Sequence, residues 1–163
     1  MRKAVNILLL LCMMAMQVNA QDTDNSRRYD AFFLDAICQQ EKGNNDAAFD
    51  LFRHCLEIDS TRSEAYFYLS RYYLALKQKD TALRYSQKAV ELEPDNETYL
   101  ETLANHYLSQ GKYPEAIATL ERLSEKNRMR DDVIGFLVQL YEQQADYDNA
   151  IRTLTRLETI EGK

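Results

Sequence analysis

The sequence predicts an all-α fold, built as a solenoid of stacked helix-turn-helix repeats. The first observation is a fixed period, because similar residues recur every 34 positions along the chain. Four alanines mark this period: Ala48, Ala82, Ala116 and Ala150. The second observation is that apolar residues within each period follow the three-and-four spacing of amphipathic helices. A fixed period of about 20–50 residues is typical of arrays in which each repeat stacks on its neighbours.

The residues around each alanine recur in the same register, which sets the repeat boundaries. Four positions after the alanines stand Phe52, Ser86, Leu120 and Leu154. Nine positions before the alanines stand Gln39, Tyr73, Tyr107 and Tyr141. Because no insertion interrupts the register, the sequence predicts four repeats, over residues 29–62, 63–96, 97–130 and 131–163.

The second repeat shows most clearly why each repeat should hold two helices. Leu69 and Tyr73 belong to an amphipathic pattern, and only residues 77–79 separate it from the next pattern. A connection this short indicates a tight turn between antiparallel helices. Thr61 and Glu64 have the spacing of a capping box at the start of the first helix.

The same plan is expected in all four repeats, with helices of about 14 residues and about 21 Å in length. The expected helices cover residues 29–42 and 46–59, 63–76 and 80–93, 97–110 and 114–126, and 131–144 and 148–161. Gly43 and Gly111 stand at two of the turns, where glycine suits a left-handed residue after a helix. Pro94 and Pro114 suit the end of one helix and the first turn of another.

Residues 1–20 have the layout of a secretory signal peptide. Arg2 and Lys3 precede an apolar run over residues 5–16, and small residues then offer a cleavage site before Gln21. We therefore expect an exported protein, located in the periplasm or cell envelope or secreted.

Two alternatives to cleavage remain open. Residues 4–20 are at the short limit for spanning a membrane, so an uncleaved N-terminal membrane anchor is one of them. Cys12 offers a lipid-modified cysteine, although Leu11 stands where a lipoprotein signal has a small residue. Residues 21–28 are expected to be a linker before the repeats.

The charge of the mature chain restricts its partners. Removing Arg2 and Lys3 from the 20 basic residues leaves 18 against 26 acidic residues, a net charge of −8. Nucleic-acid binding depends mainly on basic residues that neutralise phosphates, so no nucleic-acid partner is expected. The same argument disfavours an anionic membrane surface.

The repeats resemble the tetratricopeptide repeat family, whose pattern combines an aromatic residue, a Leu-Gly pair, a Tyr, an Ala, a large apolar residue and a Pro. The second repeat matches best, through Tyr66, Leu69, Ser70, Tyr73, Ala82, Ala89 and Pro94. The third repeat keeps Leu103, Ala104, Tyr107, Ala116 and Leu120, and the fourth keeps Leu137, Val138, Tyr141, Ala150 and Leu154. Arg128 replaces the proline in the third repeat, and the first repeat has Asp35 and Gln39 where Leu and Tyr are usual.

The resemblance implies a right-handed superhelix in which the first helix of each pair lines a concave groove. It also implies a protein or peptide ligand in that groove, with no small-molecule substrate. The expected exposed groove residues are Phe33, Ile37, Phe67, Arg71, Leu74, Glu101, Asn105 and Gln139. Packing beneath the 21–28 linker, or between repeats, is an equally weighted alternative for Phe33 and Ile37.

The carboxylate clamp of this family, which grips a C-terminal peptide with Lys, Asn and Arg, is not expected here. Its places hold Phe33, Ile37, Tyr68, Thr98 and Thr102.

The sequence offers little for catalysis, metals or cofactors. His54 and His106 lie in different repeats without the spacing of a zinc site, and His106 is expected to be a packed structural histidine. No nucleophile motif or nucleotide-binding glycine loop is present. We therefore expect a non-enzymatic protein without a cofactor.

Cys38 and Cys55 lie on the two helices of the first repeat. We expect two separate buried thiols, with a disulfide across the hairpin as the alternative in an exported protein.

The last expected helix is unusually apolar for the end of an array, where a polar outer face is normal. It carries Ile151, Leu154, Leu157 and Ile160 as well as Arg152, Thr153, Arg156 and Thr159. Three interpretations of this helix remain open. Its outer face is polar enough to be solvated, or its apolar side chains dock on another surface, or the chain is the front part of a longer array.

Two hypotheses for function therefore stand. The first is an extracytoplasmic scaffold that binds a ligand in the groove. The second is a structural subunit that self-associates or joins an envelope complex through its C-terminal repeat.

Overall fold

The structure is a computed structural model that describes residues 23–126 and 130–161, with side chains as far as Arg156. The expected signal peptide, Arg128 and the side chains of Leu157 and Ile160 lie outside the described residues. The described ranges hold eight helices and no strand. None of these helices has the length and apolar composition needed to cross a membrane.

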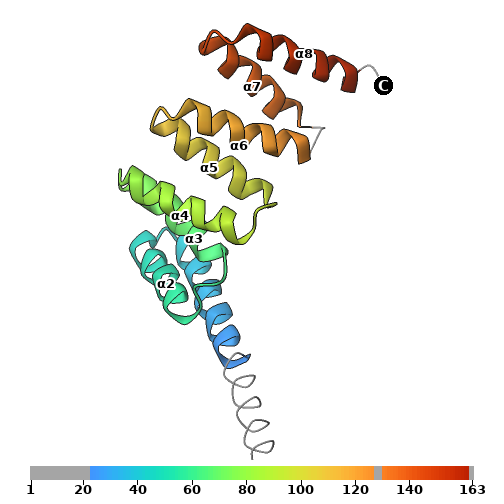
Figure 1. The fold of residues 1–163 in the computed structure, drawn as a ribbon. Coiled ribbons are helices and arrows are strands. Elements are labelled where there is room, and N and C mark those ends of the chain that lie inside the picture. Colours follow the sequence, from blue (N-terminus) through green and yellow to red (C-terminus); the bar gives the residue numbers. More distant parts are fainter. Residues whose placement is uncertain (1–22, 127–129, 162–163) are drawn as a thin grey trace, which may run out of the picture. The chain divides into compact units, whose positions relative to one another are not determined.

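The helices follow the expected order closely (Figure 1). A helix described over residues 23–41 is followed by α2 (Asn45–Ile58), α3 (Glu64–Ala75), α4 (Lys79–Leu92), α5 (Glu97–Ser109), α6 (Tyr113–Lys126), α7 (Asp131–Gln143) and α8 (Tyr147–Glu161). The largest difference concerns residues 23–28, which are helical although a linker was expected over 21–28. No Gly or Pro separates these residues from the helix that follows, so the backbone continues in the same conformation.

The chain divides into two compact units, Met1–Ala65 and Tyr66–Lys163. In the first unit, Tyr29, Cys55 and Ala65 are fully buried, and half-buried apolar side chains pack around them. Phe33 adds to this packing, since its ring lies 5.9 Å from that of Tyr29 and 5.5 Å from that of Phe52. The first unit is therefore held by aromatic side chains between the helix over 23–41 and α2.

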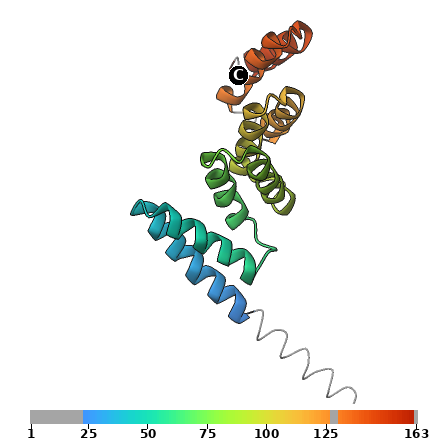
Figure 2. The ribbon, with the colours of Figure 1, turned by 90° about the vertical axis from the view of Figure 1, so that its left-hand side faces the viewer.

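The second unit is a stack of helix pairs. Helix α4 packs on α5, α5 on α6, α6 on α7 and α7 on α8. These helices succeed one another from green to red in Figure 2. A single apolar core that includes Leu100, Leu123 and Leu137 runs through these helices.

The alanines that mark the period are buried in both units. Ala48, Ala82 and Ala116 are 0 % exposed and Ala150 is 3 % exposed. A side chain no larger than a methyl group lets neighbouring helices approach closely, which explains why alanine recurs at this position.

The turn inside each repeat has the same backbone geometry. Four residues 34 positions apart have positive φ angles: Gly43 at 80°, Lys77 at 60°, Gly111 at 70° and Ala145 at 57°. The amide after each of them donates to the carbonyl oxygen five residues back, at 2.8–3.0 Å. This is the Schellman motif, so all four turns end their helices in the same way.

The capping box expected at Thr61 and Glu64 does not form. Helix α3 begins at Glu64, and the amide and hydroxyl of Thr61 donate to Asp59 at 2.9 and 2.6 Å. Glu64 instead accepts a hydrogen bond from Arg62. The prediction was wrong because each of the two side chains bonds to a residue two positions before it instead.

Candidate binding surface

Three exposed polar residues stand at the same position of the first helices in the second unit. Arg71 on α3, Asn105 on α5 and Gln139 on α7 are 34 residues apart and exposed. On each helix the adjacent side is buried, for example at Leu103 on α5 and Leu137 on α7. We call Arg71, Asn105 and Gln139 the polar stripe, because the repeat presents one of these side chains per helix pair.

Phe67 lies beneath Arg71 rather than on the surface. Its side chain is 9 % exposed, and its ring centroid is 5.0 Å from that of Tyr99 on the next pair. The expectation that Phe67 is exposed was therefore wrong, because the neighbouring repeat supplies an aromatic ring that covers it. The Arg71 guanidinium carbon lies 5.7 Å from the Phe67 ring centroid, within the range of a cation–π contact.

Glu101 is exposed but already paired with a cation. Arg130 reaches Glu101 at 3.3 Å, Glu97 at 3.7 Å and Asp132 at 2.8 Å. The hydrogen bond to Asp132 raises the pKa of Arg130 and lowers the pKa of the Asp132 carboxyl. The third and fourth repeats are thus joined by an arginine that sequence inspection missed.

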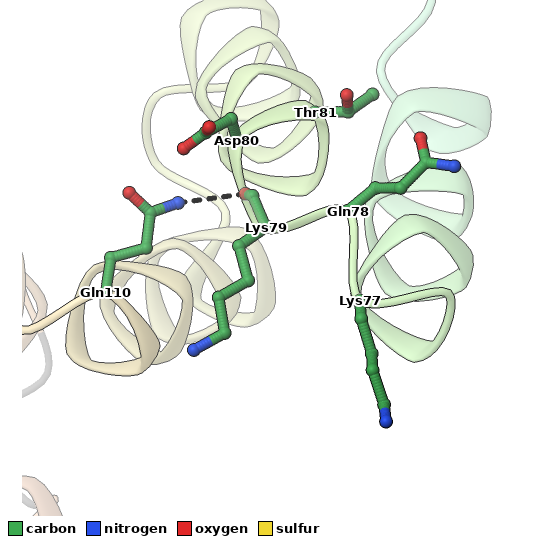
Figure 3. A pocket seen from close by; sticks show the side chains of 6 residues that line it. All are labelled: Lys77, Gln78, Lys79, Asp80, Thr81 and Gln110. Carbon is green, nitrogen blue, oxygen red and sulfur yellow. Dashed lines mark hydrogen bonds between the residues drawn. The ribbon is translucent and has the colours of Figure 1, made fainter.

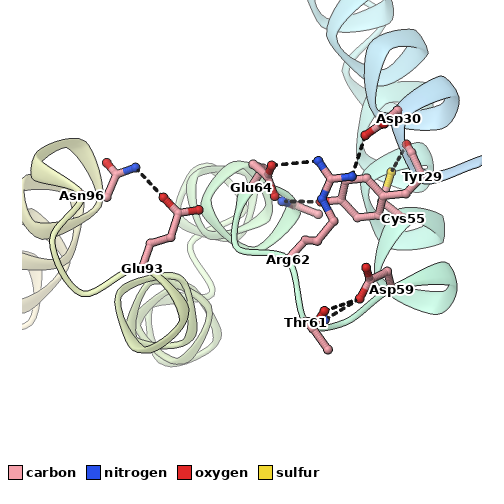
Figure 4. A network of polar contacts seen from close by, with 10 residues as sticks. Tyr29, Asp30, Cys55, Asp59, Thr61, Arg62, Glu64, Glu93 and Asn96 are labelled. Atoms are coloured by element: carbon pink, nitrogen blue, oxygen red, sulfur yellow. Dashed lines mark hydrogen bonds and ion pairs between the residues drawn. The ribbon is translucent and has the colours of Figure 1, made fainter. Parts of the chain in front are cut away.

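An equivalent arginine stands 68 positions earlier, in the first unit. Arg62 donates to Asp30 at 2.5 Å and to Glu64 at 3.0 Å, and its guanidinium carbon lies 3.9 Å from the ring centroid of Tyr29 (Figure 4). The shared position of Arg62 and Arg130 and the carboxylate two residues after each were the available sequence signal.

The side chains around Tyr29 are withdrawn from water. The Tyr29 hydroxyl accepts from the amide of Ala65 at 3.3 Å, and the Cys55 thiol donates to the carbonyl of Tyr29 at 3.9 Å. Desolvation by burial raises the pKa of Tyr29 and raises the pKa of Cys55 to about 11. Cys55 is therefore a thiol at neutral pH and a poor nucleophile.

The remaining groove candidates differ in their surroundings. Phe33 and Ile37 are half-buried in the first unit, and Phe33 takes part in the aromatic packing described above. Leu74 is half-buried on α3 in the second unit. Of the eight candidates, Arg71, Glu101, Asn105 and Gln139 are exposed, and all four belong to the second unit.

A hollow of about 520 Å³ lies at the turn between α3 and α4. Lys77, Lys79 and Gln110 line it together with Gln78, Asp80 and Thr81 (Figure 3). Gln110 donates to the carbonyl of Lys79 at 2.9 Å, and the amino group of Lys79 donates to the carbonyl of Ser109 at 2.6 Å. These bonds tie the second repeat to the third, so the polar lining has a structural role.

The cysteines and histidines have different environments. Cys55 is buried as expected, but Cys38 is exposed, so the prediction of two buried thiols was half wrong; both are free. His106 is 2 % exposed and packed as expected, whereas His54 lies 2.8 Å from Glu57 at the surface. Among the described residues, no group of three His, Cys, Asp or Glu side chains is placed to hold a metal ion.

Comparisons with known proteins agree with this architecture. One sequence model of the tetratricopeptide repeat matches residues 80–133 and 108–161, and a second matches residues 51–84. No curated protein sequence matches the chain.

Solved structures of repeat proteins are similar to this chain. A crystal structure of MamA protein has a TM-score of 0.69 at 19% identity and covers 82% of this chain and 73% of its own. MamA from Desulfovibrio magneticus RS-1 has a TM-score of 0.67 at 16% identity, with coverages of 82% and 75%. A tetratricopeptide repeat protein from Parabacteroides merdae ATCC 43184 has a TM-score of 0.73 at 17% identity, with coverages of 84% and 55%. These similarities confirm the predicted all-α fold of stacked helix pairs.

Proposed function

The chain belongs to the tetratricopeptide repeat family, and on that premise we propose that it is a non-enzymatic scaffold that binds a protein or peptide along the first helices of its repeats. The observation that carries this proposal is the polar stripe. Arg71, Asn105 and Gln139 recur at one position per repeat and are exposed, while neighbouring positions are buried in the core. A row of this kind offers contacts at regular intervals along a ligand.

The chemistry of the polar stripe suits an extended peptide. The side-chain amides of Asn105 and Gln139 each provide donors and an acceptor, which can pair with the N–H and C=O groups of a peptide backbone. The guanidinium of Arg71 can bind a carboxylate through a bidentate pair of hydrogen bonds. The ligand we expect therefore carries an acidic side chain at the end that meets α3.

We also propose that the scaffold works outside the cytoplasm, in the periplasm or cell envelope. The support is the layout of residues 1–20, with Arg2 and Lys3 before an apolar run and a small-residue site before Gln21. Intact mass spectrometry of the chain recovered from an expressing bacterium tests this proposal. The expected mass is that of a chain that begins at Gln21. A chain that still contains residues 1–20 and is recovered in the membrane fraction would support the uncleaved anchor instead.

Selection from a phage-displayed library of random linear peptides tests the binding function. The peptide enriched on the purified chain is labelled, and its affinity is measured by fluorescence anisotropy. We expect Arg71→Glu, and the pair Asn105→Ala with Gln139→Ala, each to weaken binding by about tenfold or more. The matched control is Arg84→Glu, which reverses an exposed arginine on α4, outside the polar stripe.

The outcomes separate the proposed surface from other sites. If Arg84→Glu weakens binding as much as Arg71→Glu does, the effect is one of overall charge. If none of the polar-stripe variants changes the affinity while circular dichroism shows them folded, the ligand binds elsewhere and the proposal fails.

A further inference from the structure

Three large apolar side chains form an exposed row on α8. Tyr147 is 63 %, Ile151 is 61 % and Leu154 is 42 % exposed. Their spacing of four and three residues places them on one side of the helix. We call these three residues the α8 face.

The previous repeat shows what such a row does. Tyr113, Ile117 and Leu120 stand at the same positions on α6, 34 residues earlier. Leu120 is 4 % exposed, and Tyr113 and Ile117 are half-buried against the core, where α6 packs on α7. The α8 face therefore repeats a surface that accepts a helix.

We propose that the α8 face binds the α8 face of a second copy of this chain, as a two-fold symmetric pair of antiparallel helices. This inference goes beyond the proposed function, because the polar stripe lies on the first helices of the repeats and takes no part in it. Two observations favour a second copy in this arrangement.

The first observation disfavours a head-to-tail contact between copies. Such a contact would use the positions of the helix over 23–41 that correspond to Val133, Leu137 and Leu140 of α7. These positions hold Ala31, Asp35 and Cys38, which are exposed, whereas their three counterparts on α7 are buried. Burial of the Asp35 carboxylate against the three apolar side chains of the α8 face would be costly, because the carboxylate would lose its contact with water. A two-fold contact avoids this cost and closes the assembly at two copies.

The second observation is charge complementarity beside the α8 face. Asp148 and Arg152 are exposed, one turn apart, and lie on the same side of the apolar row. When two copies of α8 run antiparallel, Asp148 comes opposite the partner subunit's Arg152, and Arg152 comes opposite the partner subunit's Asp148. Parallel packing would lack this exchange of opposite charges.

Sedimentation equilibrium of the full chain, over a range of concentrations, tests the pairing. The expected result is a mass that rises with concentration toward twice the mass of the monomer. Ile151→Glu should weaken self-association by about 30-fold or more, since it places a carboxylate in the middle of the contact. Ile151 is 61 % exposed, so this variant is expected to keep the fold. The matched control is Leu76→Glu, at an apolar residue that is 57 % exposed in the turn after α3 and should leave the mass unchanged.

A charge exchange identifies the occupant of the face. Asp148→Arg and Arg152→Asp should each weaken the pair by about tenfold, and the double variant should restore it. A wild-type chain that stays monomeric at high concentration overturns the proposal. So does self-association that survives Ile151→Glu. Association that Ile151→Glu abolishes but the double variant does not restore assigns the α8 face to another occupant.

Discussion

The hydroxyl of Tyr141 donates a 2.5 Å hydrogen bond to the carboxylate of Glu121, joining α7 to α6 across the boundary between two repeats. One repeat earlier the same two positions hold Tyr107 and Gln87, and the Gln87 amide donates to the Tyr107 hydroxyl at 3.0 Å. The tyrosine at this position thus links neighbouring repeats in both cases, through a hydrogen bond to a charged partner at Tyr141 and to a neutral partner at Tyr107. The side chain of Tyr141 also belongs to the apolar core, and that of Tyr107 is half-buried against it.

Tyr141→Phe is expected to lower the free energy of unfolding by about 1.5–2 kcal/mol, because it removes a hydrogen bond to a charged acceptor. Tyr107→Phe removes the neutral counterpart and should cost about 0.5–1 kcal/mol. Urea denaturation followed by circular dichroism measures both. A larger loss for Tyr107→Phe than for Tyr141→Phe would contradict the assignment of the stronger bond to Glu121.

Glycine is expected to stabilise the chain at two of its turns. Lys77 and Ala145 have φ angles of 60° and 57°, a conformation that costs an L-residue about 1–2 kcal/mol. Lys77→Gly and Ala145→Gly relieve that strain, while the added freedom of the unfolded chain takes back about 0.4–1 kcal/mol. Each variant should therefore gain about 0.5–1 kcal/mol in thermal or urea unfolding.

The reverse substitution, glycine to alanine, is the matched test at the other two turns, and it should lower the free energy of unfolding. Gly43→Ala and Gly111→Ala should each lose about 0.5–1 kcal/mol, although no heavy atom lies within 4 Å of the added Cβ. The loss then arises from the backbone alone. Equal stability of Gly111→Ala and wild type would show that the positive φ is not strained in this turn.

His106 is expected to make the chain less stable in mild acid. Its side chain is 2 % exposed, burial lowers its pKa, and its Nδ1 has no hydrogen-bond partner among the described residues. Because the folded pKa is below the unfolded value of about 6.5, the unfolded chain takes up the proton first. Stability is therefore full above the unfolded pKa and falls as the pH drops below it, by at most about 1.4 kcal/mol per pH unit.

Urea unfolding of wild type and His106→Gln at pH 7 and pH 5 measures this effect. The variant itself is expected to be less stable at pH 7, because it alters a packed position. Its loss between pH 7 and pH 5 should nevertheless be smaller than that of wild type. An unchanged loss would show that other groups dominate the response to acid.

Arg62 is expected to stabilise the first unit through its ring contact as well as through its charge. Arg62→Ala should cost about 1–2 kcal/mol, since it removes two ion pairs and a guanidinium stacked 3.9 Å from Tyr29. Arg62→Lys keeps the charge but not the planar group, so it should recover only part of the loss. Hydrogen exchange at the amide of Ala65, which donates to the Tyr29 hydroxyl, reports on this unit. Full recovery by lysine would assign the effect to charge alone.

The repeat period was sufficient to predict most of the fold. Burial of the four alanines, the order of the helices and the turns at Gly43 and Gly111 all follow from side-chain size and backbone freedom, which are local properties. The turns at Lys77 and Ala145 have the same geometry without glycine. At these two positions the residue type does not indicate a positive φ angle, and only the 34-residue spacing from Gly43 and Gly111 predicts it.

The burial of Phe67 could not be predicted from local sequence, because it depends on a contact between distant residues. Phe67 is buried because Tyr99 of the next repeat covers it. Glu101 is exposed as predicted, but its ion pair with Arg130, 29 residues later, was not predicted. Cys38 is exposed at a position where His106 and Leu140 are buried in later repeats. Helical spacing alone does not reveal which side chains a neighbouring repeat will cover. The part of the groove prediction that assigns ligand contacts remains a prediction.

The packing of the second unit has a consequence for the order in which its helix pairs fold. Its most extensive helix contacts, α4 with α5 and onward to α7 with α8, join elements that follow one another in the sequence. Contacts between near neighbours close only short loops, so ordering one pair does not wait for the far end of the polypeptide. Each helix pair can therefore pack on the pair before it without waiting for the repeats beyond it, so ordering of the second unit can proceed one repeat at a time.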